Sequence, residues 1–299
     1  MSFTSPYGGV PDFSIASIQI GDGITSINCD IGVPMPAIGG TWEITTNSAL
    51  SISTSLVFNS SFYNYGYIVA GGDMKFNASS NNYGTIQQSS AKFLINATFT
   101  NHDEIINYGT ITVNGTLVNT GDITNDTQID IIGTFNNNGN LENNGTLHNT
   151  GTITNGDIIT NYGTITNDNS MTINSSLVNE GTVTNNDSIT TYGTYDNTGS
   201  SGITNNNGSF IVDGIFKNAT DFNNDGTFAI AGVMSLDTDG TLSWLGNGVY
   251  GDWTIQKIKG EQGPKGETGS GFRVVSTNPI QSVAVGGDST TSSALSYLV

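Results

Sequence analysis

Carboxylates, histidines and tyrosines are the side chains of this sequence that could carry out chemistry. Hydrolysis of a glycosidic bond needs two carboxylates about 5 to 9 Å apart. If the chain stacks in coils, Asp168 could approach Asp187, and Asp126 could approach Glu142. These acids fall at different places of the local sequence repeat. The pattern therefore does not favour a glycosidase, and we expect no enzyme and no catalytic residue.

Metal-binding and cofactor motifs are also weak. His102 and His148 are 46 residues apart and lack the paired spacing of a zinc site. The stretches DTDG at Asp237 and NNDG at Asn223 lack the later glutamate of a calcium loop and are typical of turns. No phosphate-binding loop, nucleophile elbow or dinucleotide motif occurs. We therefore predict no metal site and no cofactor.

Three tyrosines are the candidate contacts for a glycan. Tyr108, Tyr162 and Tyr192 occupy the same place of a six-residue repeat. An aromatic ring combines a large apolar surface with a polar hydroxyl, which suits it to a sugar ring. These tyrosines favour a binding module as the second hypothesis for function.

Repeats of six residues are the elements that must position these side chains. Between residues 91 and 198 the third place of each hexad is apolar in all eighteen repeats, the first is glycine in ten and the fifth is asparagine in thirteen. The apolar spacing continues upstream from Ile44 to Ile86, with Ser80 as one lapse, and downstream from Phe210 to Met234. An extra residue before Phe93 and an odd step around TGSSGITNNNGS interrupt it. Such regularity indicates a repeat architecture.

A period of six fits the two-residue period of a β-strand and not the 3.6-residue period of a helix. The glycine, the apolar residue and the asparagine of a hexad then point to one side of the strand. Stacking of coils buries the apolar column and aligns the asparagine amides in a ladder. The predicted core column contains Ile111, Leu117, Ile123, Leu147, Ile153, Ile165, Leu177 and Val183. The predicted ladder contains Asn119, Asn137, Asn149, Asn161 and Asn185.

The predicted fold is an all-β parallel β-helix, or β-solenoid, whose triangular coils contain about three hexads, giving about ten coils in total. A coil of two hexads, or a prism in which three chains each supply one face, is the alternative. Segments such as VNTGDITND at Val118 and HNTGTITNG at His148 recur every five hexads. Because five is not a multiple of three, we interpret the block of five hexads as the unit of gene duplication and not of the coil.

Composition divides the chain into five segments. We expect an N-terminal cap or attachment arm at 1–40, a solenoid shaft at 41–240, an aromatic collar at 241–258, a collagen-like segment at 259–271 and a β-rich tail at 272–299. Trp244, Tyr250 and Trp253 of the collar are expected to plug the last coil, because an open sheet edge needs a cover. An interface hot spot is the alternative for these three side chains.

The collagen-like segment reads KGEQGPKGETGSGF and has glycine at every third residue, at Gly260, Gly263, Gly266 and Gly269. Glycine is required at this spacing where three polyproline-II chains meet at one axis. Lys265 and Glu267 carry opposite charges that can pair between chains. The segment therefore predicts a homotrimer, and a flexible glycine-rich linker is the alternative.

The chain is strongly acidic, with 25 acidic and 7 basic residues and a net charge of −18. Such a surface repels phosphate backbones and anionic lipids, so we expect neither nucleic-acid binding nor membrane insertion. Cys29 is the only cysteine, which excludes an intrachain disulfide framework. The N-terminal residues lack the basic and apolar regions of a signal peptide.

The NxGTIxN hexads from Asn107 onward resemble the β-solenoid shafts of bacterial adhesins and autotransporter passengers. Joined to GEQGPKGETGSGF, the chain resembles collagen-like surface fibre proteins of large DNA viruses and bacteriophages. The resemblance implies a trimeric fibre or spike on a virion or cell surface, made without a signal peptide. Its implied partners are its own copies, other appendage proteins and host-surface glycans. A polysaccharide-degrading tailspike is the third hypothesis.

Overall fold

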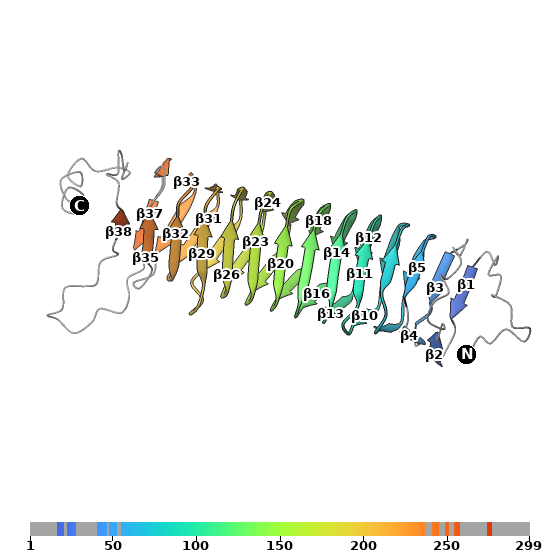
Figure 1. Ribbon diagram of the computed structural model, residues 1–299. Coiled ribbons are helices and arrows are strands. Elements are labelled where there is room, and N and C mark those ends of the chain that lie inside the picture. Colours follow the sequence, from blue (N-terminus) through green and yellow to red (C-terminus); the bar gives the residue numbers. More distant parts are fainter. Residues whose placement is uncertain are drawn as a thin grey trace, which may run out of the picture. The chain divides into compact units, whose positions relative to one another are not determined.

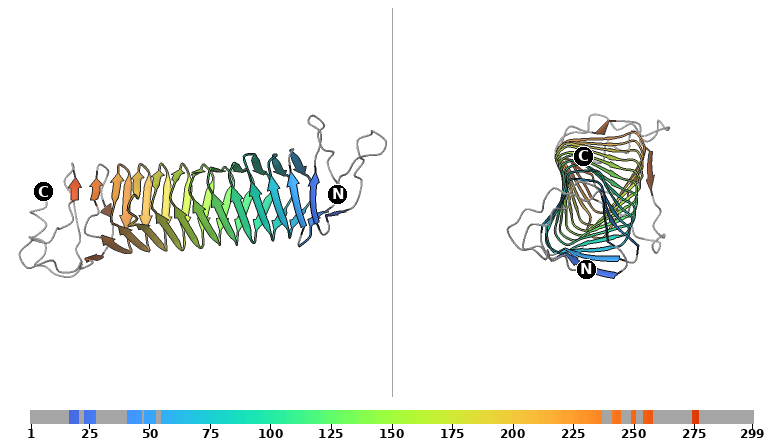
Figure 2. Two further views of the ribbon diagram at one scale, coloured as in Figure 1. Left: turned by 90° about the horizontal axis from the view of Figure 1, so that it is seen from below. Right: turned by 90° about the vertical axis from the view of Figure 1, so that its right-hand side faces the viewer.

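The computed structural model describes residues 17–20, 23–27, 41–46, 48–52, 55–236, 241–244, 249–250, 254–257 and 274–276. These residues form strands and the corners between them, and none of them lies in a helix. The chain divides into two compact units, residues 1–153 and 154–299. In both units successive strands wind through three parallel sheets, here named faces A, B and C (Figure 1; Figure 2). The predicted fold is confirmed: the chain is an all-β parallel β-solenoid with about ten coils in all.

The first unit contains these strands in sequence order within each face. Face A comprises β1 (Ser17–Ile20), β3 (Thr41–Ile44), β6 (Phe62–Asn64), β9 (Ser80–Asn82), β12 (Thr98–Asn101), β15 (Thr116–Asn119) and β18 (Thr134–Asn137). Face B comprises β2 (Gly23–Ile27), β4 (Ser48–Ile52), β7 (Tyr67–Ala70), β10 (Thr85–Gln88), β13 (Glu104–Asn107), β16 (Asp122–Asn125) and β19 (Asn140–Asn143). Face C comprises β5 (Leu56–Phe58), β8 (Met74–Phe76), β11 (Lys92–Ile95), β14 (Thr110–Val113), β17 (Gln128–Ile131) and β20 (Thr146–Asn149).

The second unit follows β21 (Thr152–Asn155), which lies at the division between the units. Its face A comprises β24 (Ser170–Ile173), β27 (Ser188–Thr191), β30 (Ser209–Val212), β33 (Thr227–Ile230) and β36 (Val249–Tyr250). Face B comprises β22 (Ile158–Asn161), β25 (Ser176–Asn179), β28 (Thr194–Asn197), β31 (Ile215–Asn218), β34 (Val233–Leu236) and β37 (Thr254–Lys257). Face C comprises β23 (Thr164–Asn167), β26 (Thr182–Asn185), β29 (Ile203–Asn206), β32 (Asp221–Asn224), β35 (Thr241–Trp244) and β38 (Val274–Ser276).

The register between neighbouring strands gives the size of a coil. Ile111 of β14 pairs with Ile129 of β17, and the hydrogen-bonded Asn107 and Asn125 are likewise 18 residues apart. In the second unit Ile165 of β23 pairs with Val183 of β26 at the same separation. Each coil is therefore formed by three consecutive hexads of one chain, one hexad on each face, and the two alternatives for the coil are not adopted.

Insertions shift this register without interrupting the sheets: toward the ends Trp42 pairs with Phe62 and Phe222 with Leu242 at 20 residues each, and two further insertions lie between these coils. The extra residue before Phe93 makes one coil 19 residues long, so that Phe93 pairs with Met74. Three extra residues at the corner between β28 and β29 lengthen another coil to 21 residues, because Val183 pairs with Thr204. Thr204, six residues before Phe210, therefore occupies an apolar place of the hexad.

The apolar column forms the core of each unit. Strand β23 has buried second and fourth residues and half-buried first and third residues, and the other hexads alternate in the same way. The eight residues expected in the core are at most 1% exposed: Ile111, Leu117, Ile123, Leu147, Ile153, Ile165, Leu177 and Val183. Ser80, the lapse in the pattern, is also buried, and its hydroxyl donates to the Ala78 carbonyl at 3.0 Å.

The asparagine ladder is confirmed, and its amides also close the corners. The Asn119 Nδ2 donates to Asn137 Oδ1 on the next coil at 2.8 Å and to the carbonyls of Gly121 and Asn140 at 3.0 Å each. The Asn119 Oδ1 accepts from Asn101 Nδ2 at 2.8 Å. One buried amide thus joins two neighbouring coils and the turn that follows its own strand, so no polar atom of the rung is left without a partner.

The same arrangement recurs in both units. Asn161 donates to Asn179 at 2.8 Å and Asn185 donates to Asn206 at 2.7 Å. Asn149 is fully buried, and its Oδ1 accepts from the Gly151 N–H at 3.1 Å. All five asparagines that the sequence places in the ladder are therefore buried and hydrogen-bonded.

Glycine at the first place of a hexad permits close contact between coils. At Gly133 an added Cβ would overlap the carbonyl oxygen of Gly115 on the preceding coil, and at Gly181 it would overlap that of Gly163. A side chain there would push the coils apart. Asp187 occupies the same place of another hexad, so only some corners require glycine.

A cluster of aromatic rings fills the core of the second unit around the longer coil. Tyr195 is fully buried and packs edge to face on Phe210, with ring centroids 4.9 Å apart. Its hydroxyl lies 2.7 Å from Thr204 Oγ1, which provides the buried phenol with a hydrogen-bond partner. Burial raises the pKa of Tyr195 far above its ordinary value, although the bond to Thr204 partly offsets the shift.

The ends of the chain contribute strands to these sheets. Within 1–40, β1 and β2 pair with β3 and β4. Within 241–258, β35, β36 and β37 pair with β32, β33 and β34. The tail contributes β38, which pairs with β35. The roles of these segments as cap, collar and tail stay predictions, and the collagen-like segment at 259–271 and Cys29 lie outside the described residues.

Replacement of a ladder asparagine should destabilise the fold more than replacement of an exposed one. Asn119→Ala leaves the buried Asn137 Oδ1 without the donor from Asn119, so we expect a loss of about 1–3 kcal/mol in the free energy of unfolding. Asn114, which donates to Asn96 at an exposed corner, is the matched control, and Asn114→Ala should change stability by less than about 0.5 kcal/mol. Urea denaturation measures both, and equal effects would contradict the structural role of the ladder.

The pair formed by Tyr195 and Thr204 should be coupled. Tyr195→Phe and Thr204→Val each leave one buried hydroxyl without this partner, so each should cost about 1–3 kcal/mol. The double variant removes both polar groups and should cost less than the sum of the two single changes. A double-mutant cycle by thermal unfolding tests this, and strict additivity would show that the hydroxyls do not interact.

Alkaline pH should weaken the second unit through Tyr195. The folded protein holds this proton at a pH where the unfolded chain, with a pKa near 10.0, has lost it. The stabilisation is therefore complete below about pH 10 and is lost as pH rises above it, by up to about 1.4 kcal/mol per pH unit. Urea denaturation between pH 9 and pH 11.5 should show a steeper loss for the natural chain than for Tyr195→Phe. Parallel curves would count against burial of this tyrosine.

Candidate functional site

An exposed column of aromatic rings lies at the corner between faces A and B of the first unit. Tyr65, Tyr83 and His102 each follow a strand of face A, namely β6, β9 and β12. The rings of Tyr65 and Tyr83 stack with centroids 5.0 Å apart and 5° between their planes. The rings of Tyr83 and His102 stack at 4.3 Å and 3°. The coil spacing of the solenoid therefore holds three rings face to face along its axis.

Polar contacts hold the His102 ring, which lies at one end of this column. The His102 Nδ1 lies 3.1 Å from Thr120 Oγ1 on the next coil, and its Nε2 lies 3.3 Å from Asn81 Oδ1. At the other end, the pKa of Tyr65 is raised by partial burial first and then by the negative charge of neighbouring groups, Tyr83 and Glu43 among them. The Tyr65 hydroxyl therefore loses its proton at a higher pH than an ordinary tyrosine does.

A shallow hollow lies beside the column, with a volume of about 410 Å³. It is lined by Ala49, Tyr65, Gly66, Tyr67, Tyr83, Gly84, Thr85 and Asp103. Tyr67 and Thr85 are paired residues of β7 and β10 on face B. Gly66 and Gly84 separate them from the corner tyrosines, and an added Cβ at Gly84 would overlap the Gly66 carbonyl oxygen, so the two coils lie in close contact here.

The three tyrosines selected from the sequence do not form a column of this kind. Tyr108, Tyr162 and Tyr192 are 44%, 50% and 57% exposed. Tyr162 follows β22 on face B, whereas Tyr192 follows β27 on face A, so the two lie at different corners of the second unit. They are five hexads apart, and five hexads are not a whole number of three-hexad coils. A role for any of them in glycan contact stays a prediction.

Of the two acidic pairs considered for catalysis, Asp126 and Glu142 are bridged by an asparagine, and Asp168 bonds to an asparagine on the next coil. The Asn144 Nδ2 donates to Asp126 Oδ1 at 2.8 Å and to Glu142 Oε1 at 2.9 Å. The Asn186 Nδ2 donates to Asp168 Oδ1 at 2.6 Å. These carboxylates therefore take part in polar columns on the outside of the coils.

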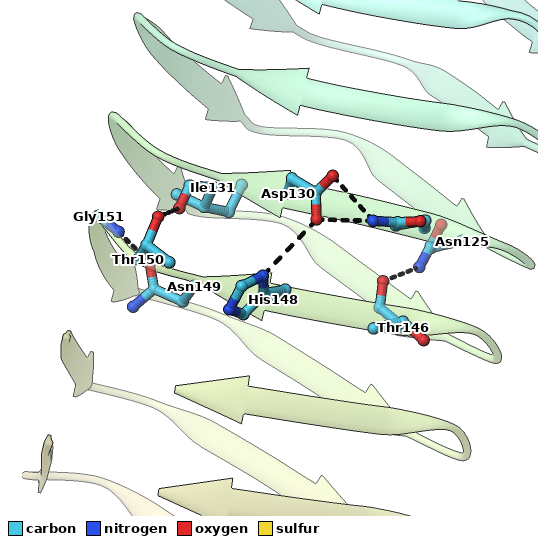
Figure 3. Close-up of polar contacts among 9 residues, drawn as sticks. Asn125, Asp130, Ile131, Thr146, His148, Asn149, Thr150 and Gly151 are labelled. Carbon is cyan, nitrogen blue, oxygen red and sulfur yellow. Dashed lines mark hydrogen bonds and ion pairs between the residues drawn. The ribbon is translucent and has the colours of Figure 1, made fainter. Parts of the chain in front are cut away.

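His148 belongs to a polar group on face C. Its Nδ1 lies 3.9 Å from Asp130 Oδ1, and both Asp130 oxygens accept from Gln128 Nε2 at 2.9 Å (Figure 3). Across the part of the chain that the structure describes, no group of three or more histidine, cysteine and acidic side chains is placed to hold a metal ion. Asn223, from one turn-like stretch, donates to Asn205 at 3.0 Å, and Asp237 lies outside the described residues.

The aromatic column was missed by the sequence analysis although a signal for it is present. Tyr65 and Tyr83 are 18 residues apart, but His102 follows at 19 because of the extra residue before Phe93. A search for equal hexad places within the regular block cannot find a column that crosses this insertion. The collar residues Trp244 and Tyr250 lie on β35 and β36, and Trp253 lies outside the described residues.

No known protein family, curated protein or solved structure matches this chain. Within the described ranges, no helix is long and apolar enough to cross a membrane.

Proposed function

We propose that this chain is a structural, non-enzymatic subunit of a trimeric fibre or spike that projects from a virion or cell surface and serves attachment. Continuous hydrogen bonding from coil to coil is the observation that carries the proposal. Within the first unit the Thr116 N–H donates to the Ala97 carbonyl at 3.0 Å, and the Thr134 N–H donates to the Gly115 carbonyl at 2.9 Å. Corners are therefore bonded as well as strands.

The hydrogen bonds between coils make the stack stiff, and the buried amide ladders add to its stiffness. A rung such as Asn119 bonds both to the next amide and to the next corner. A coil cannot slide or tilt without breaking strand, corner and ladder bonds together, and each repeat contacts only its neighbours. Such a stack keeps its coils in fixed positions over many repeats, which is the property that a shaft requires.

The surface charge also suits an exposed shaft. The net charge of −18 keeps neighbouring particles apart in solution and opposes aggregation. The partners that we propose are further copies of the chain and other proteins of the same appendage. Support for the trimer comes from the sequence KGEQGPKGETGSGF, since glycine at every third residue is the requirement of a collagen triple helix.

The mass of the full chain in solution tests the proposal. Size-exclusion chromatography with light scattering should give three times the chain mass of 31.3 kDa. Gly266→Ala should lower the trimer's melting temperature because a side chain does not fit at the triple-helix axis. Thr268→Ala, at a place without this constraint, is the matched control and should leave the trimer unchanged.

A monomeric chain at micromolar concentration would overturn the proposal of a trimer. A trimer that is equally stable in both variants would show that contacts other than the collagen-like segment hold the three chains together.

A further inference from the structure

The hollow beside the aromatic column is open to solvent and is lined by tyrosines and an acidic side chain. Its volume of about 410 Å³ falls within the range of sites for small molecules. Three tyrosines, Tyr65, Tyr67 and Tyr83, contribute to its lining and are each about 40% exposed, at 38%, 39% and 41%.

The charge of the hollow selects against anions. Asp103 lines it, and the neighbouring Glu104 accepts from Thr85 Oγ1 at 3.2 Å. Its lining contains no lysine or arginine. A carboxylate or sulfate on a ligand would therefore be repelled, as it would be by the acidic chain as a whole.

The stacking of the rings limits which of their surfaces a ligand can reach. The facing sides of Tyr65 and Tyr83 are covered by each other, and Tyr83 also stacks on His102. Beside a stack of this kind a ligand meets ring edges, which carry positive partial charge and attract oxygen atoms. The ring edges and the absence of a basic side chain from the lining therefore suit a neutral molecule rich in hydroxyl groups better than an anion.

The remaining polar groups suit such a molecule. The Asp103 carboxylate can accept hydrogen bonds from hydroxyl groups, and the tyrosine hydroxyls can donate or accept. The Tyr67 hydroxyl is held by Gln87 Oε1, which positions it at the side of face B. The ring of Tyr67, which is 39% exposed, offers apolar surface to the C–H groups of a sugar ring.

We propose that the hollow formed by Tyr65, Tyr67, Tyr83 and Asp103 binds a neutral saccharide unit of a glycan. This site is distinct from the shaft role and does not depend on it. An open hollow gives a weak single contact; in the trimer proposed above, three copies would raise the apparent affinity through multivalency, although the site itself does not require the trimer.

Binding of the full chain to an array of neutral oligosaccharides, with sialylated and sulfated counterparts, tests the inference. We expect binding to neutral glycans that end in a hexose or an N-acetylhexosamine, and weaker binding to their anionic counterparts. Tyr83→Ala and Asp103→Asn should each reduce the signal at least tenfold. Tyr108→Ala is the matched control, because Tyr108 is 44% exposed at the same hexad place but follows β13 on face B.

The outcomes separate this site from the shaft role. Absence of binding, a preference for anionic glycans, or binding that survives both Tyr83→Ala and Asp103→Asn would overturn the inference and leave the trimer untouched. A loss with Tyr108→Ala as large as that with Tyr83→Ala would also overturn it. Circular-dichroism melting of each variant shows that the fold is kept, and Tyr83→Phe, which retains the stacked ring, should bind better than Tyr83→Ala.

Discussion

Hydrogen bonding between equivalent residues of successive coils is the constraint on which the rest of the structure depends. A six-residue strand with one apolar side chain cannot bury that side chain alone, so a hexad gains stability only from the coil before and the coil after it. Once coils stack in register, every place of the repeat becomes a column. Isoleucine then lies over isoleucine, as at Ile111 and Ile129, and asparagine lies over asparagine, as at Asn119 and Asn137. The buried amides are tolerated because they bond to amides of neighbouring coils and to corner carbonyls, which leaves few buried polar atoms without partners.

The same stacking organises the outside of the coils. A side chain at a corner has a neighbour about 4.8 Å away on the next coil, so a chance run of similar residues becomes a continuous surface feature. In the first unit this converts Tyr65, Tyr83 and His102 into a stack of rings with a hollow beside it. It also converts acids and amides into polar columns, as where Asn144 bridges Asp126 and Glu142. A rigid scaffold with a varied exterior can support both a structural role and a binding site, because the exterior residues contribute little to the core.

Insertions show how much irregularity the stack accepts. A single extra residue before Phe93 and three extra residues before Thr204 are absorbed at corners, where the chain turns and no sheet is interrupted. The second insertion places a threonine in the apolar column, next to the largest buried side chain of the described core, Tyr195. The hydroxyls of Tyr195 and Thr204 are hydrogen-bond partners of each other, so the two groups offset the cost of burying both. Corners are thus the places where this fold can change in length, whereas the strands must keep their alternation.

The sequence by itself determined the strand period, the core column, the amide ladder and the class of fold, because these follow from a local repeat that is visible without knowledge of which residues touch. The coil of three hexads followed from geometry and was predicted as the first of several alternatives. Only the tertiary structure decided which residues at the same place of the hexad lie at the same corner of the solenoid. Tyr162 and Tyr192 have the same hexad place but different corners, because their separation is not a whole number of coils. Tyr83 and His102 share a corner only because an insertion lengthens one coil. Register across an insertion depends on how the chain closes each turn, and no periodic pattern records it.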